Sequence, residues 1–123
     1  MSQLRVLVVE DEQMMVEIIE RVLVRKFAAL VDLAGNGREG LQQAAEQTYS
    51  LILSDIRMPE MDGISMLERI RTGSGPNRAT PVILLTGHHR EGLSAASTLD
   101  ARFMGKPFRR KELCNVVSEL LAA

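Results

Sequence analysis

Short apolar runs alternate with longer amphipathic stretches along the chain. The apolar runs have the length and the Val, Ile and Leu content of strands that are covered on both faces. They predict five strands, at residues 4–9, 29–34, 50–55, 82–86 and 101–105. Between the strands, apolar residues recur at the three- and four-residue spacing of amphipathic helices. That spacing predicts five helices, at residues 12–27, 36–46, 62–72, 91–99 and 109–122, counting Asn36 and Asp62 as N-caps.

Strands that alternate with helices predict an α/β fold with a parallel sheet covered on both faces. Asn36, followed by Glu39, has the pattern of a capping box, and Asp62 is the predicted cap of the third helix. Gly63 is expected to serve the geometry of the turn. Residues 73–81, rich in Gly and Pro, are predicted to form a loop.

The carboxyl ends of parallel strands meet at one edge of the sheet, and this edge is where such folds bind ligands. Polar residues follow four of the five predicted strands, whereas the second strand ends on Ala34 and Gly35. The polar residues are Glu10, Asp11 and Glu12 after the first strand, Asp55 at the end of the third, Thr86 at the end of the fourth and Lys106 after the fifth. Glu12 is expected only to favour the dipole of the following helix.

Composition narrows the class of protein. The chain has 123 residues, 46% of them apolar, and a net charge of −1, so no global basic field favours nucleic acid or an anionic membrane. One cysteine, Cys114, excludes an internal disulfide framework. No apolar run approaches the roughly 20 residues that span a bilayer. The N-terminus lacks a signal-peptide pattern, so the cytoplasm is the expected compartment.

The predicted strand-end cluster is too acidic to exist without a cation. Two carboxylates about 4 Å apart repel by about 4 kcal/mol at an effective dielectric constant of about 20. Mg²⁺, which prefers oxygen ligands, resolves this repulsion among Glu10, Asp11 and Asp55. Lys106 adds a charge that holds an anion, and Thr86 adds a hydroxyl donor. Together these groups predict a phosphoryl-transfer site in which Asp55 is the nucleophile and forms an acyl phosphate.

Four motifs together resemble the receiver domain of two-component response regulators, the CheY-like family. They are the acid pair after the first strand, "SDIRMPEMDG" (54–63), "LLTG" (84–87) and "KPF" (106–108). The resemblance covers essentially the whole chain. It implies a flavodoxin-like doubly wound sheet of five parallel strands in the order 2-1-3-4-5 with five helices. It also leads us to expect that residues 1–123 are a single receiver domain, with no output domain in this chain.

The resemblance also implies roles for the residues of the site. Asp55 would be the phosphoacceptor. Asp11 would bind Mg²⁺ directly, Glu10 through a metal-bound water, and Arg57 through its backbone carbonyl. The bond between Lys106 and Pro107 would be cis. The chain departs from the family pattern in having Glu10 where Asp is commoner, and Arg57 and His88 near the acceptor.

The implied switch begins with Thr86 and Lys106, which would contact the phosphoryl oxygens. Thr86 would move toward them and Phe103, the switch aromatic, would follow. The surface that changes would be the fourth helix, the fifth strand and the fifth helix, where a downstream protein would bind. The phosphoryl donor would be a sensor histidine kinase or a histidine phosphotransfer protein. We expect a monomer or a phosphorylation-dependent dimer that contacts neither nucleic acid nor membrane directly.

Two other functions are compatible with parts of the pattern. A pseudo-receiver would be a binding module that is never phosphorylated, but the acceptor, the acids, Thr86 and Lys106 are all present. A phosphatase with an aspartyl nucleophile needs a second acid two residues later, where this chain has Arg57. The chain is therefore not expected to be an enzyme, except that it would catalyse its own aspartyl phosphorylation and dephosphorylation.

Overall fold

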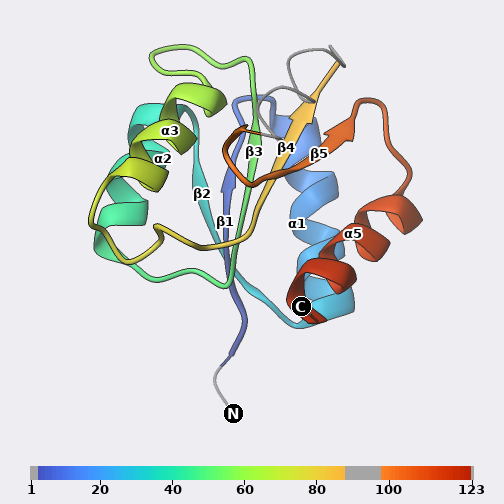
Figure 1. The fold of residues 1–123 in the computed structure, drawn as a ribbon. Coiled ribbons are helices and arrows are strands. Elements are labelled where there is room, and N and C mark those ends of the chain that lie inside the picture. The colour runs from blue at the N-terminus through green and yellow to red at the C-terminus, as the bar shows by residue number, and fades with distance from the viewer. Residues whose placement is uncertain (1–2, 88–97, 123) are drawn as a thin grey trace.

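Five parallel strands form a single twisted sheet in the computed structural model, which describes residues 3–87 and 98–122 (Figure 1). The sheet order β2-β1-β3-β4-β5 confirms the predicted order. All four strand pairs are parallel. The strands are β1 (Arg5–Val9), β2 (Leu30–Ala34), β3 (Leu51–Asp55), β4 (Val82–Thr86) and β5 (Arg102–Gly105).

Four helices lie in the described part of the chain, one fewer than predicted. They are α1 (Gln13–Phe27), α2 (Gly37–Glu46), α3 (Gly63–Thr72) and α5 (Arg110–Ala122). The remaining predicted helix, at 91–99, falls almost entirely outside the described residues and stays a prediction. None of the described helices is long and apolar enough to cross a membrane.

The helices cover the two faces of the sheet in pairs, with α1 and α5 on one face and α2 and α3 on the other (Figure 1). Strand residues alternate between two cores because successive side chains point to opposite faces. Val6 and Val8 of β1 pack in the core that includes α1 and α5. Leu7 and Val9 pack in the core that includes α2 and α3. Burial on both faces explains why the central strands are continuously apolar.

Both predicted N-caps are confirmed. The side chain of Asn36 accepts a hydrogen bond from the backbone N–H of Glu39 at 2.9 Å, and Asp62 accepts one from the N–H of Ser65 at 2.7 Å. The Asn36 amide also donates to the Glu39 carboxylate at 3.0 Å, so these two side chains contact each other directly. These caps fix where α2 and α3 begin.

Asn77 ties the predicted loop 73–81 to the rest of the domain. Its side chain is almost completely buried, at 1% exposure. Its amide oxygen accepts from the backbone N–H of Tyr49 at 2.8 Å and from the Thr80 hydroxyl at 2.9 Å. Its amide nitrogen donates to the backbone carbonyls of Ala44 and Gln47, both at 2.6 Å. The side chain therefore joins the end of α2, the approach to β3 and the loop before β4.

We expect Asn77→Asp to destabilise the domain by about 3 kcal/mol. The substitution keeps the acceptor for Tyr49 but points a carboxylate oxygen at two carbonyl oxygens that now lack a donor. Urea unfolding gives the measurement. Asn115→Asp, at an exposed position on α5, is the matched control and should change stability by less than about 0.5 kcal/mol. Equal stabilities of the two variants would contradict this role for Asn77.

Candidate functional site

The ends of β1 and β3 bring two buried carboxylates together. The two strands pair in register, with Val9 beside Ser54, so the next residues along, Glu10 and Asp55, leave the sheet side by side. Glu10 is 3% and Asp55 7% exposed. Asp11 is exposed at the same edge, and one carboxylate oxygen from each of the three acids lies within 4.8 Å of the others. The predicted acidic cluster is therefore present.

Lys106 reaches this cluster from the end of β5. Its ammonium nitrogen lies 2.6 Å from Oδ2 of Asp55 and 3.4 Å from Oε1 of Glu10. The backbone N–H of Lys106 donates to the carbonyl of Thr86 at 2.8 Å, which continues the pairing of β4 and β5. The Lys106–Pro107 bond is cis, as the family resemblance implied.

The electrostatics of the cluster show an excess of negative charge. Burial and the charge of Asp55 raise the pKa of Glu10 to about 7, although Lys106 and the hydrogen bond from Glu12 N–H act in the opposite direction. Burial alone would lower the pKa of Lys106. Its hydrogen bond to Asp55 and the charges of Asp55 and Glu10 outweigh burial and raise the pKa. The ammonium group of Lys106 contacts Glu10 and Asp55, and Asp11 adds a third carboxylate to the cluster, so one positive charge does not balance the three acids.

Backbone groups orient the two buried carboxylates, and these contacts were not predictable from residue types. The N–H of Ile56 donates to Oδ1 of Asp55 at 2.8 Å, which leaves Oδ2 toward Lys106. The N–H of Glu12 donates to Oε2 of Glu10 at 3.2 Å. Every residue except proline carries such a donor, so no sequence motif marks them.

Gly63 is needed for close packing rather than for turn geometry, which corrects our expectation. Its φ angle is not positive. A Cβ atom at this position would lie 2.1 Å from the carbonyl oxygen of Asp55 and 3.0 Å from the hydroxyl of Ser54. The N–H of Gly63 donates to the carbonyl of Ile56 at 2.8 Å. Glycine therefore allows the start of α3 to pack directly behind Asp55.

The predicted switch residues lie on one face of adjacent strands. Thr86 is buried at the end of β4, with 2% exposure. Phe103 is half-buried on β5 and pairs with Leu84, two residues before Thr86. Its neighbour Met104 packs in the core of α1 and α5, so Phe103 points to the opposite face, the one toward which Leu84 points.

The remaining predicted residues are exposed or lie outside the described part of the chain. Arg57 is exposed, two residues beyond Asp55 in the loop that leads to α3. Glu12 is the N-cap of α1 rather than a first-turn residue, and its side chain makes no capping hydrogen bond. His88 lies outside the described residues.

The ligand atoms that this cluster offers are of the kind that bind a hard divalent cation. Its available side-chain ligands are carboxylate oxygens, which Mg²⁺ and Ca²⁺ prefer. Direct coordination at about 2.1 Å allows two ligand oxygens to be at most about 4.2 Å apart. The three carboxylate oxygens lie within 4.8 Å of one another, which is close to this limit. The residues present therefore fit a single hard divalent cation, held by the acids directly or through bound water.

Comparisons with known proteins agree with this geometry. The family model for the response regulator receiver domain matches residues 6–118. A protein named "Probable chemotaxis protein CheY" from Rhizobium etli is 28% identical over 99% of this chain and 95% of its own length. The hybrid signal transduction histidine kinase G of Dictyostelium discoideum is 32% identical over 95% of this chain. The chain spans only 4% of that kinase's length.

A solved structure shows the same architecture with an ion in place. The receiver domain of a sensor histidine kinase from Pseudomonas aeruginosa PAO1 has a TM-score of 0.85 and 30% identity, covering 99% of this chain and 100% of that one. It is described with a magnesium ion coordinated in its active-site cleft. The family match over nearly the whole chain, the sheet order and the acidic cluster lead to one conclusion: this chain belongs to the response regulator receiver domain family of two-component signalling.

Proposed function

We propose that this receiver domain accepts a phosphoryl group from a phosphohistidine onto Asp55, with Mg²⁺ at Glu10, Asp11 and Asp55, and thereby switches its protein contacts. The main support for this proposal is the burial and hydrogen bonding of the Asp55 carboxylate. This carboxylate is buried at a strand end, held by the Ile56 N–H on one oxygen and by Lys106 on the other. A carboxylate in this setting is an oriented nucleophile rather than a solvated surface group.

The chemistry requires one bond to form and one to break. A carboxylate oxygen of Asp55 attacks the phosphorus, the phosphorus–nitrogen bond breaks, and the imidazole leaves with its electron pair. Glu10, Asp11, Asp55 and the backbone carbonyl of Arg57 would hold Mg²⁺. The ion would neutralise charge on the phosphoryl oxygens. Lys106 would move its hydrogen bond from the carboxylate to a phosphoryl oxygen.

Thr86 and Phe103 would transmit the change. Phosphorylation adds close to two negative charges and strong acceptors at Asp55. The hydroxyl of Thr86 would turn toward them and vacate space on the face of the sheet where Phe103 lies. Phe103 has no polar group to desolvate, so its inward state carries no such cost. The downstream protein would bind across the predicted fourth helix, β5 and α5, and dimerisation on phosphorylation is one form that this response could take.

The phosphoryl donor and the cellular compartment also stay proposals. The donor would be a sensor histidine kinase or a histidine phosphotransfer protein, and the compartment the cytoplasm. That residues 1–123 form a single receiver domain stays a prediction. We do not propose turnover of an external substrate.

Asp55→Asn should abolish Mg²⁺-dependent uptake of radiolabel from a phosphohistidine donor, because the amide cannot act as the nucleophile. The wild-type label should be labile to hydroxylamine, as an acyl phosphate is. Asp100→Asn, an exposed position before β5 at the opposite end of the strand from Lys106, is the matched control and should label normally. Label retained in Asp55→Asn would refute the acceptor. A wild-type chain that never labels would favour the pseudo-receiver, and turnover of a phosphomonoester would favour a phosphatase.

The metal-free protein should lose stability as the pH rises from about 4.5 to about 7. The pKa of Glu10 is raised from 4.5 to about 7 in the folded state. Between these values the folded protein holds a proton that the unfolded chain has released, so unfolding becomes easier as the pH rises through this window. Urea unfolding in EDTA should show this slope in the wild type and a flatter profile in Glu10→Gln.

The exposed carboxyl of Glu68 on α3 supplies the control. Glu68→Gln should follow the wild-type profile. If the wild type and Glu10→Gln ran parallel across the window, buried Glu10 would not be the source of the pH dependence.

Beryllium fluoride, which mimics the phosphoryl group, should change hydrogen-exchange protection mainly in residues 86–104. The physical reason is that Thr86 and Phe103 repack while α2 and α3 do not. Mass spectrometry with and without the mimic gives the measurement, with Asp55→Asn as the variant that should not respond. Changes confined to α2 and α3 would rule out this readout.

A further inference from the structure

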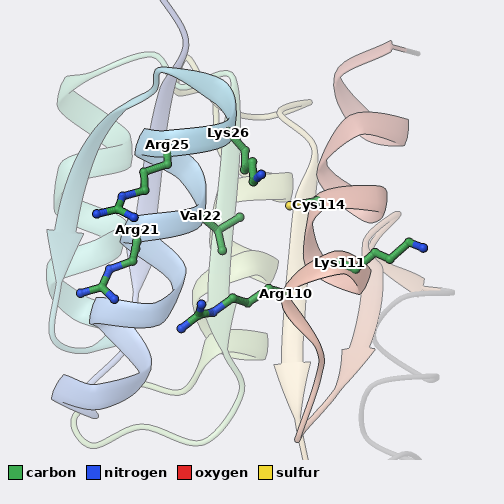
Figure 2. Close-up of a pocket in the computed structure, with 7 residues that line it drawn as sticks. All are labelled: Arg21, Val22, Arg25, Lys26, Arg110, Lys111 and Cys114. Atoms are coloured by element: carbon green, nitrogen blue, oxygen red, sulfur yellow. The ribbon is translucent and has the colours of Figure 1, made fainter.

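A basic groove lies between α1 and α5, outside the acidic site. The groove has a volume of about 570 Å³ and is open to solvent (Figure 2). Figure 2 shows Val22 of α1 and Cys114 of α5 facing the space between the helices, and Arg110 extending from α5 toward α1. The other residues that line the groove are also cationic: Arg21, Arg25, Lys26 and Lys111.

Positive residues are concentrated around this groove without local ion pairs, although Figure 2 shows Arg21 and Arg25 directed away from α5 and Lys111 directed away from α1. Five of the chain's 15 Lys and Arg residues line it, although the chain as a whole has a net charge of −1. Within residues 3–87 and 98–122, none of the five forms an ion pair. One carboxylate, Glu17, lines a small adjoining cavity with Arg21 and Arg110. It can offset at most one of the five charges.

Helix stability explains only part of this arrangement. Arg25 and Lys26 lie in the last turn of α1, where the helix dipole favours cations. Arg110 and Lys111 open α5, where the same dipole disfavours them. Arg110 and Lys111 therefore make the start of α5 less stable. Their presence there points to a role in binding.

We propose that the α1–α5 groove binds a small organic anion that carries two or more phosphoryl groups, such as a nucleoside polyphosphate. This proposal goes beyond the proposed function and uses none of the residues around Asp55. The cavity volume lies within the roughly 300–1,000 Å³ that is typical of small-molecule sites. Arginine guanidinium groups match phosphate with paired hydrogen bonds. Val22 and Cys114 provide an apolar floor for the organic part.

Two other occupants fit the groove less well. A second copy of the chain, docked through a two-fold interface, would bring the same five cations face to face. An acidic peptide would spread its carboxylates along its length. A chain of phosphoryl groups concentrates several charges over about one helix turn, which is the separation between Arg21 and Arg25 on α1.

The test measures binding of adenosine triphosphate and of inorganic tripolyphosphate in EDTA, so that the acidic site contributes no metal-dependent binding. Amide chemical shifts of the wild type locate the ligand, and calorimetry at about 50 mM salt gives its affinity. Arg21→Gln with Arg110→Gln removes two charges from the groove. Arg38→Gln with Arg69→Gln removes two from exposed positions on α2 and α3 and is the matched control. Circular dichroism checks that both variants fold.

Shifts in residues 21–26 and 110–114, with affinity reduced at least about tenfold in the groove variant and less than about twofold in the control, would support the proposal. Tighter binding of the nucleotide would show that the apolar floor contributes, whereas equal binding would show that the phosphoryl groups suffice. No shift in these residues, or equal losses in both variants, would overturn it. Binding of an oligoglutamate peptide with no binding of either phosphate would also overturn it, in favour of an acidic protein partner.

Discussion

Lys106 holds two carboxylates that the fold has removed from water. Glu10 and Asp55 are buried because their strands are central and adjacent, and the burial of like charges side by side is unfavourable unless a cation compensates it. Lys106 comes from β5, on the far side of β4, and its ammonium group lies 2.6 Å from Asp55. The ion pair therefore depends on the order of the sheet. It leaves a net negative charge around Glu10, Asp11 and Asp55, which favours a divalent cation at this edge of the sheet.

The position of Asp55 depends on the packing behind it. Gly63 lets α3 begin against the carbonyl of Asp55, and the N–H of Ile56 orients the carboxylate from the same loop. At the other end of the sheet, Asn77 fixes the connections that lead into β3 and β4. Hydrogen bonds and close packing therefore hold both ends of β3.

The small net charge of the chain conceals two regions of opposite sign. The strand edge is acidic around Glu10, Asp11 and Asp55, whereas the groove between α1 and α5 is basic. Exposed fields of this kind extend over about 8–10 Å at physiological ionic strength. The two regions therefore attract different ligands, and the net charge predicts neither of them.

Local patterns in the sequence were sufficient for most of the fold. Apolar runs and helical spacing located the five strands and the four described helices, and Asn36 and Asp62 marked two of the helix starts. The rule that strand ends meet at one edge then brought Glu10, Asp11, Asp55, Thr86 and Lys106 to the same place. Only the tertiary structure decided the rest. Lys106 meets a carboxylate 96 residues away, Gly63 is required by an oxygen eight positions earlier, and the basic groove joins helices from the two ends of the chain. Propensity and periodicity act over a few neighbouring residues, whereas these contacts exist only after the sheet and its helices have packed.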